Sequence, residues 1–235
     1  MKTDSLQIAT LETTTAVGQT VAILAHRFNN IVQGTQGGTY LVDIGFERND
    51  ISIAKQGWEI VKRNQERLAE LLESLIDLGQ HIKLDLESQT FDQIGSLIEK
   101  SLVETSEIQF VFESWFSKEP CDRTANIDVE GIAVIVSKLA GLAFLASEMQ
   151  QPKINVVAGE IEPDKFFIDF EYVGAVICTT SSELKRCLHI PISSQVGGVE
   201  FALSEKIAKA HGGSVKVHSA SDDDPNRKIR VEIPL

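Results

Sequence analysis

Residues 24–42 read LAHRFNNIVQGTQGGTYLV, and the first half of this stretch has the spacing of an amphipathic helix. Its apolar residues belong to a run with steps of three, four and three residues, the spacing of a coiled-coil seam: Val21, Leu24, Phe28 and Ile31. The glycines further along each cost roughly 1 kcal/mol in a helix relative to alanine, and close packing against another helix would account for them. We therefore expect a first long helix over residues 5–46.

A second apolar run predicts a helix over residues 53–82, after a polar turn at 47–52. The run has steps of three and four residues: Trp58, Val61, Gln65, Leu68, Leu72 and Leu75. Two such helices joined by a short loop form an antiparallel hairpin, which leaves half of each apolar stripe uncovered. A second copy of the hairpin would cover it and give a dimeric four-helix bundle. Packing of the hairpin on the C-terminal domain of its own chain is the alternative.

Beyond residue 85 the pattern becomes a mixture of helices and strands. Helices are expected at 90–104 (entered through Thr90 or Asp92), at 129–149 and at 199–211, the last stopped by Gly212 and Gly213. Strands are expected at 108–115, 153–159, 165–177, 214–219 and 228–233, the second and third of them forming a hairpin. Helices combined with a mostly antiparallel sheet make this an α+β protein. We place the domain boundary between residues 1–84 and residues 85–235.

Charge and composition exclude several functions. The formal net charge of -12 argues against nucleic acid or an anionic membrane surface as the main partner. The longest apolar run, 132–146, is interrupted by Ser137 and Lys138, and we expect no membrane insertion. The N-terminal residues MKTDSLQIATLETTT are polar, unlike a secretory leader. The cysteines have no metal-ligand spacing with the histidines, so we expect no metal site and free thiols in a reducing cytosol: Cys121, Cys178 and Cys187.

His26 has the position of an exposed side chain on the first helix. It lies two residues after Leu24 and two before Phe28, so it points about 200° away from each at 100° per residue. An exposed imidazole in the middle of a helix is a nucleophile that a docking partner could reach. Taken alone, this position is also that of an ordinary surface histidine.

The residues around His26 give it a context. The stretch LAHRFNNIVQGTQGGTYLV, followed by GWEIVKRNQERLAELLESLIDLGQ, closely resembles the two dimerisation helices of sensor histidine kinases. The segment GGVEFALSEKIAKAHGGSVKVHS resembles the kinase segment in which a glycine box runs into a helix and a strand. The resemblance covers about residues 15–235. It implies that His26 carries a phosphoryl group, that the partner is a receiver-domain aspartate, and that the second domain is a Bergerat-like α/β sandwich.

The residue after the histidine departs from the family pattern. Active kinases of this kind carry an aspartate or glutamate there, which orients the imidazole and accepts its proton. In this chain the residue is Arg27, which cannot act as a base but can hold a phosphoryl group electrostatically. Asn29 and Asn30, three and four residues after His26, are close enough to polarise a phosphoryl oxygen or a water molecule. Hydrogen bonding at the helix surface is their alternative role.

The nucleotide-binding boxes depart further. The asparagine that ligates magnesium in the kinases aligns with Leu142, and the aspartate that reads adenine aligns with Tyr172. In the first glycine box Gly174 is kept but Val176 replaces the second glycine, and in the last box only Gly198 is well placed. Glu200 stands where backbone must approach phosphate. Loss of a metal ligand and gain of a carboxylate both oppose binding of ATP and magnesium.

The other histidines predict no chemistry of their own. His211, in the stretch AHGG, keeps its family-like place, and we expect it to cap a helix end. His81, His189 and His218 are expected at the surface.

Together these observations predict a cytoplasmic, homodimeric histidine phosphotransfer protein. The reaction would move a phosphoryl group reversibly between His26 and a receiver aspartate, with no tightly bound cofactor. Magnesium would be held by the receiver's own carboxylates, and an upstream kinase is a possible further partner. An ATP-dependent autokinase with an unusual nucleotide site is the first alternative. A non-catalytic pseudokinase scaffold is the second.

Overall fold

The structure is a computed structural model that describes residues 2–104, 109–116, 124–147, 153–162, 164–174, 177–178, 196–219 and 226–235. Side chains are described from residue 24 onward within these ranges, except at positions 26, 162, 177–178, 196–197 and 219. The chain divides into two compact units, Met1–Ile76 and Asp77–Leu235. This division, after Ile76, lies a few residues before the domain boundary expected from the sequence, between residues 84 and 85. The expected domain boundary stays a prediction.

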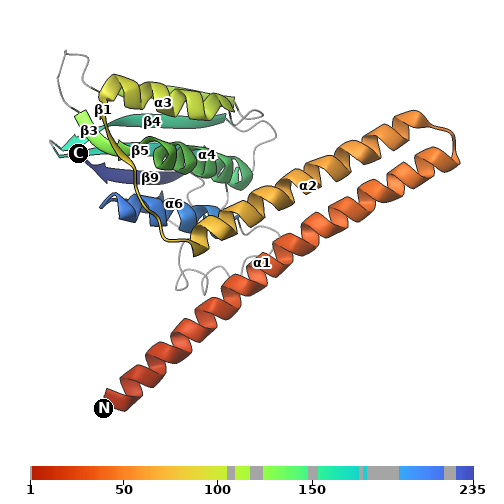
Figure 1. Cartoon of the computed structure of the whole chain (residues 1–235), viewed down its shortest axis with the longest axis horizontal. Coiled ribbons are helices and arrows are strands. Elements are labelled where there is room, and N and C mark those ends of the chain that lie inside the picture. Colours follow the sequence, from red (N-terminus) through yellow and green to blue (C-terminus); the bar gives the residue numbers. More distant parts are fainter. Residues whose placement is uncertain are drawn as a thin grey trace. The chain divides into compact units, whose positions relative to one another are not determined.

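The first unit is a helical hairpin made of α1 (Lys2–Glu47) and α2, which begins at Ile51 and ends at Gly79 in the second unit (Figure 1). Asn49, with φ of 52°, ends α1 in the left-handed conformation. The amide of Asn49 donates to the carbonyl of Phe46, and the amide of Asp50 donates to that of Gly45, which forms a Schellman motif. The carboxylate of Asp50 then accepts hydrogen bonds from the amides of Ser52 and Ile53 and caps α2. The two long helices expected from the sequence are therefore confirmed.

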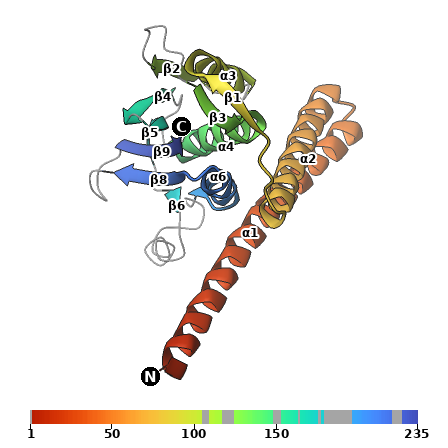
Figure 2. The ribbon, with the colours of Figure 1, turned by 60° about the vertical axis from the view of Figure 1, so that its left-hand side comes forward.

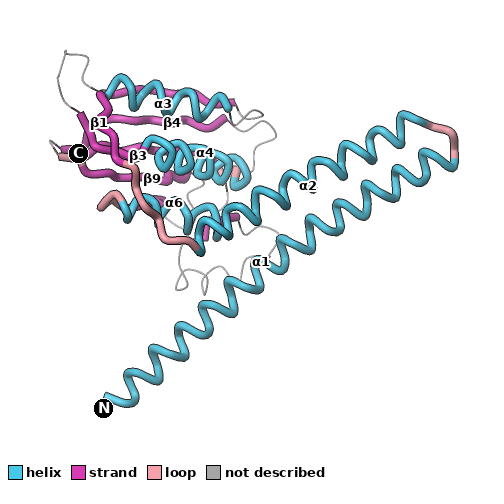
Figure 3. The backbone as a smooth tube through the Cα atoms, viewed as in Figure 1, coloured by secondary structure: helices cyan, strands magenta, loops and turns pink. Residues whose placement is uncertain are grey.

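Glycines allow the backbones of α1 and α2 to pack against each other along the hairpin (Figure 3). A Cβ atom added to Gly38 would lie 2.8 Å from the carbonyl oxygen of Gly57 and 2.9 Å from Cγ2 of Val61. One added to Gly45 would overlap the backbone of Ala54. These contacts confirm that helix packing accounts for glycines that would otherwise weaken α1.

One apolar stripe of α2 is left uncovered by α1 within the hairpin. The side of α2 that faces α1 includes the buried residues Ala54, Gly57, Val61, Asn64 and Leu71. The stripe beside it repeats at heptad spacing and is exposed: Ile51, Trp58, Leu72 and, four residues later, Ile76. For α2 this confirms the expectation that the hairpin leaves part of its apolar stripe uncovered.

The second unit is an α+β sandwich. Its main sheet has five strands in the order β2-β4-β5-β9-β8, antiparallel except for β2 and β4. Their bounds are β2 Gln109–Trp115, β4 Lys153–Glu162, β5 Lys165–Val173, β8 Ser214–Ser219 and β9 Asn226–Pro234. Figure 2 shows that three helices cover one face of the sheet: α3 (Phe91–Glu104), α4 (Val129–Ala146) and α6 (Val199–Ala210). Two pairs of short strands complete the unit: β1 (Leu86–Thr90) with β3 (Thr124–Asp128), and β6 (Ile177–Cys178) with β7 (Val196–Gly197).

The core of this unit lies between the three helices and the sheet. Helix α4 is its centre, with Ile132, Ile135 and Leu139 fully buried. It is also the one helix among the described residues that is long and apolar enough, by length and composition, to cross a membrane. The apolar run is therefore longer than the sequence argument assumed, but eight of its residues are buried in the core of the unit. Packing of this kind accounts for its hydrophobicity.

Side-chain caps define where the helices of the second unit begin and end. Thr90 and Gln93 form a capping box at α3, with each side chain accepting from the other's backbone amide. Thr90, one of the two expected caps, is therefore the residue that starts this helix. The ammonium group of Lys206 on α6 donates hydrogen bonds to the carbonyls of Asp77, Leu78 and Gln80. These bonds cap the C-terminal end of α2, where carbonyl groups have no partner within the helix.

His211 joins two helix ends. Its Nδ1 lies 2.8 Å from the carbonyl oxygen of Ile207, at the end of α6, and its Nε2 accepts from the amide of Asp128 at 3.0 Å. Asp128 in turn caps α4, because its carboxylate accepts from the amide of Gly131. With Nε2 as the acceptor, Nδ1 is the ring nitrogen that donates to the carbonyl of Ile207. The expected helix-end role of His211 is confirmed, and the structure adds its bond to Asp128.

We predict that Gly38→Ala destabilises the hairpin, whereas Gly37→Ala stabilises it. Alanine improves helix propensity by about 1 kcal/mol at either site. At position 38 the new methyl group meets backbone and Val61, and such overpacking costs about 1–3 kcal/mol. At position 37 nothing lies within 4 Å of the added carbon. Thermal unfolding followed by circular dichroism measures both variants, and equal melting temperatures would contradict the packing argument.

We predict that His211→Leu lowers the free energy of unfolding by about 1–3 kcal/mol, because the amide of Asp128 loses its acceptor. The exposed His81 provides the matched control, and His81→Leu should change stability by less than about 0.5 kcal/mol. Urea unfolding of the three proteins gives the comparison. Equal free energies of unfolding for both variants and the unsubstituted chain would show that the bond from Asp128 to His211 does not stabilise the fold.

Candidate functional site

The helix around His26 has a packed face and an open face. His26 lies within α1, and its side chain is outside the described residues. The described seam residues on either side, Leu24, Phe28 and Ile31, are half-buried. On a helical wheel, position 26 falls within about 20° of positions 33 and 37, which are seven and eleven residues further along. Gln33 and Gly37 are both exposed, so this arc of α1 is turned away from α2.

The polar residues next to His26 lie on both faces of α1. Asn29 and Asn30 are exposed, one turn along the helix from position 26. Arg27 is half-buried, between the open arc and the seam. A guanidinium group and two amides can stabilise the oxygens of a phosphoryl group through charge and hydrogen bonds. The backbone thus brings these four candidate positions into one and a half turns of helix.

The positions aligned with the kinase nucleotide boxes lie in a different environment, within the second unit. Leu142 is only 2 % exposed and belongs to the hydrophobic core between the helices and the sheet. Tyr172 is 3 % exposed, and its burial raises the pKa of the phenol, an effect that the positive charge of Arg227 opposes. Gly174 is buried and forms an isolated bridge with Ser147. Val176 lies outside the described residues.

Glu200 occupies the first turn of α6, next to Gly198. Gly198 precedes the helix with φ of 104°, a conformation that favours glycine. The N-terminus of a helix attracts anions because its amides and dipole point outward. The carboxylate of Glu200 adds a negative charge to that turn. A phosphate at the same place would meet like charge.

No group of three histidine, cysteine, aspartate or glutamate residues that could hold a metal ion occurs among the described residues. Two of the three cysteines, Cys121 and Cys187, lie outside them, and only the backbone of Cys178 is described.

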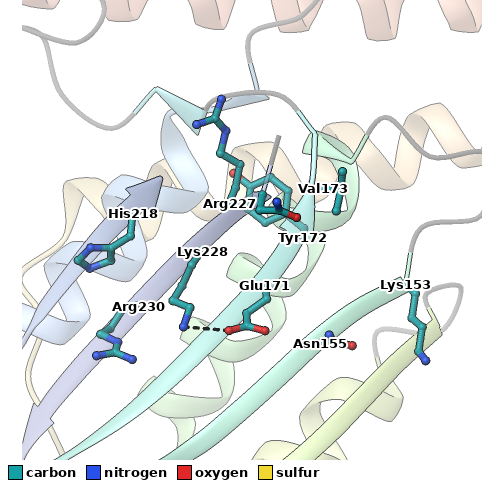
Figure 4. Close-up of a pocket in the computed structure, with 10 residues that line it drawn as sticks. Lys153, Asn155, Glu171, Tyr172, Val173, His218, Arg227, Lys228 and Arg230 are labelled. Atoms are coloured by element: carbon teal, nitrogen blue, oxygen red, sulfur yellow. Dashed lines mark ion pairs between the residues drawn. The ribbon is translucent and has the colours of Figure 1, made fainter. Parts of the chain in front are cut away.

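The sequence analysis missed a pocket on the second unit. It lies on the face of the five-stranded sheet opposite the helices, has a volume of about 570 Å³, and is lined mainly by charged and polar side chains (Figure 4). Lys228 lies at its centre, with its Nζ 2.9 Å from Oε1 of Glu171. The alternation of charged with apolar residues in RKIRVEI, 227–233, is the sequence signal that could have located it.

Comparison with known proteins gives a fold but no close relative. No protein-family model and no curated protein matches the sequence. The solved structure of Acinetobacter baumannii histidine kinase AdeS is similar with a TM-score of 0.60 and 17% identity, over 89% of this chain and 97% of AdeS. Full-length ShkA in complex with AMPPNP is similar with a TM-score of 0.50 and 16% identity, over 97% of this chain and 45% of ShkA.

These neighbours confirm the architecture expected from the sequence. In each comparison the similarity extends over both the helical hairpin and the α+β sandwich, since it covers most of this chain. The chain has the fold of a sensor histidine kinase core.

Proposed function

We propose that this chain is a histidine phosphotransfer protein built on the histidine kinase core fold. A phosphoryl group would move between an aspartate of a receiver domain and His26. In the forward direction a neutral imidazole nitrogen attacks phosphorus, the bond from phosphorus to the aspartate oxygen breaks, and the carboxylate leaves with the electron pair. The receiver would supply the magnesium ion through its own carboxylates. An upstream kinase that phosphorylates the receiver is a possible further partner.

The burial of Leu142 is the observation that carries this proposal. In the resemblance to the kinases, position 142 is that of a magnesium-ligating asparagine, and here an apolar side chain is 2 % exposed within the core. A leucine cannot coordinate a cation, and exposing it to bind one would cost about 1.5–3 kcal/mol. Glu200 adds a negative charge in the helix turn that would face phosphate. These features support phosphoryl exchange with a partner rather than attack on ATP.

Position 26 suits a docking partner. The arc of α1 that holds it is exposed at its described neighbours, so a globular receiver could approach the imidazole from solvent. Arg27 would replace the family's acid and hold the transferring phosphoryl group by charge. Asn29 and Asn30 would donate hydrogen bonds to its oxygens. The chain itself needs no nucleotide for this reaction.

Two other functions remain as alternatives. An ATP-dependent autokinase is favoured by the likeness to ShkA, whose structure is a complex with AMPPNP. A pseudokinase scaffold that binds kinases or receivers without chemistry is favoured by the loss of the acid at Arg27. The experiment on His26 described next separates all three.

The first prediction concerns transfer of label. Radiolabel from a phosphorylated receiver domain should appear on the purified chain, be lost in acid and be absent in His26→Gln. His81→Gln, at an exposed histidine of the second unit, should accept label normally. Gel autoradiography after mixing with a panel of labelled receivers measures the transfer.

A parallel reaction with labelled ATP decides between the alternatives. We expect no label from ATP, in the chain as it is or in Arg27→Glu, because restoring the acid does not restore the nucleotide site. Label from ATP alone would establish the autokinase. If neither donor labels the chain while receivers still bind, the scaffold is correct and His26 takes no part.

We also propose that the hairpin forms a cytoplasmic homodimer. Trp58 and Leu72, seven and twenty-one residues after Ile51, are 52% and 44% exposed in the single chain. Large apolar side chains repeated at heptad spacing form the seam of a helical bundle when a second copy covers them. The partner hairpin would thereby complete the half of the bundle that one chain leaves open.

The second prediction tests this dimer. The double substitution Leu68→Glu and Leu72→Glu should convert the dimer to a monomer. Burying two carboxylates in an apolar interface costs more free energy than burial of the remaining apolar side chains contributes to dimerisation. Gln56→Glu with Arg63→Glu changes charge at exposed positions on another face of α2 and should leave the dimer intact. Multi-angle light scattering at micromolar concentration gives the mass, and a monomeric unsubstituted chain would overturn the proposal.

A further inference from the structure

The register of the five-stranded sheet arranges its outward side chains in rows across the strands. Two neighbouring rows, read from β8 to β4, are His218, Lys228, Glu171, Asn155 and Lys216, Arg230, Asp169, Val157. In both rows β9 contributes a cation and β5 a carboxylate. Because paired residues on one face lie side by side, the two strands hold each other's charges in fixed positions.

Asp169 anchors this arrangement. It is only 2 % exposed, although it lies on the face without helices. Both carboxylate oxygens of Asp169 accept hydrogen bonds from Arg230: Oδ1 from Nε at 2.7 Å and Oδ2 from Nη2 at 2.6 Å. The Nζ atom of Lys228 lies 3.1 Å from Oδ2 of Asp169. The guanidinium carbon of Arg230 also lies 4.8 Å from the ring centre of Phe167. These contacts hold the two cations without a bound ligand.

Both cations stay protonated. The hydrogen bond from Asp169 raises the pKa of Arg230 and outweighs the opposite effect of burial. Burial tends to lower the pKa of Lys228, but the hydrogen bonds from Glu171 and Asp169 together raise it above its ordinary value. The positive charges of Lys228 and Arg230 are therefore retained throughout the physiological pH range.

The pocket concentrates positive charge in an acidic chain. Among the described residues, four cationic side chains line it, Lys153, Arg227, Lys228 and Arg230, against one carboxylate, that of Glu171. Counting Asp169 behind Arg230 still leaves an excess of cations, while the chain as a whole has a net charge of -12. A basic pocket on an acidic molecule attracts a small anion rather than an extended polyanion.

The remaining lining suits an organic group. Val173 is 39% exposed and offers apolar surface, and His218 and Asn155 lie nearby (Figure 4). These two side chains and that of Asn226, which also lines the pocket, can form hydrogen bonds with a ligand. A volume of about 570 Å³ lies within the range of small-molecule sites, and it exceeds what a bare phosphate would fill.

We propose that this pocket binds a small organic phosphate, of about the size of a nucleoside monophosphate. Lys153 and Lys228 would contact the phosphate, and the organic group would lie against Val173. The pocket opens on the face of the sheet away from α3, α4 and α6, and its lining belongs entirely to the second unit. This proposal therefore does not rest on the phosphotransfer proposed for His26.

The test uses the full chain with adenosine monophosphate, inorganic phosphate and adenosine as separate probes in calorimetric titrations. Adenosine monophosphate should bind, and Lys153→Glu should weaken it about tenfold, the effect of losing one charge-assisted contact. Lys216→Glu is the matched control, because Lys216 lies on the same face, pairs with Glu232 at 3.6 Å and does not line the pocket. The three aspartates of the segment 220–225 are outside the described residues and stay unchanged in every variant.

A second readout locates the ligand. In proton–nitrogen spectra the imidazole signals of His218, at the rim, should shift on titration, and those of His211 should not. Tighter binding of adenosine monophosphate than of phosphate, with adenosine weakest, supports the proposal. The proposal is wrong if adenosine monophosphate does not bind at millimolar concentration, or if phosphate or adenosine binds as tightly as adenosine monophosphate. It is also wrong if Lys153→Glu and Lys216→Glu weaken binding equally. Shifts at His211 without shifts at His218 would overturn it as well.

Discussion

The contact between Gly38 and Gly57 determines which face of α1 meets solvent. Backbone lies against backbone at this point, so α1 cannot turn about its axis without adding a clash elsewhere along the hairpin. The Schellman turn at Asn49 sets the same orientation from the end of the helix. Position 26 therefore lies on the exposed arc of α1. The apolar residues of α2 at heptad spacing stay exposed, where a second hairpin could cover them. Site and assembly surface both depend on this approach of two helices.

In the second unit the sheet register performs the corresponding task. Alternate residues of β5 and β9 point to opposite faces, so Phe170 and Ile229 enter the core while Glu171 and Lys228 form an ion pair on the other side. A slip of one residue would bury the charges and expose the core. The ion pair between buried Asp169 and half-buried Arg230 opposes such a slip, since the carboxylate of Asp169 would be costly to bury without its partner.

Elements with strong periodicity could be predicted from the sequence, and contacts between distant residues could not. The helices and the hairpin of β4 and β5 follow from apolar spacing over nine or more residues. The strands β1 and β3 were missed because they have five residues each. β1 shows no alternation, and the alternation of TANID in β3 is too short to distinguish a strand from a loop. The bond from Asp128 to His211 spans 83 residues, and nothing local in either segment indicates it. The charges of the outer pocket were visible in the sequence, but only the register brings four strands together around it.

The fold itself explains how a nucleotide site could be lost without loss of structure. In a sandwich of this kind the helices must bury an apolar stripe against the sheet whether or not a ligand is bound. An asparagine that faces a magnesium ion is costly once the ion is absent, because its amide then needs other hydrogen-bond partners. Leucine at position 142 removes that cost and adds to the core of α4. Glu200 similarly stabilises the first turn of α6, where a phosphate would otherwise neutralise the helix end. Under the proposed function, both residues would favour the protein without nucleotide, and both belong to the unit that does not contain His26.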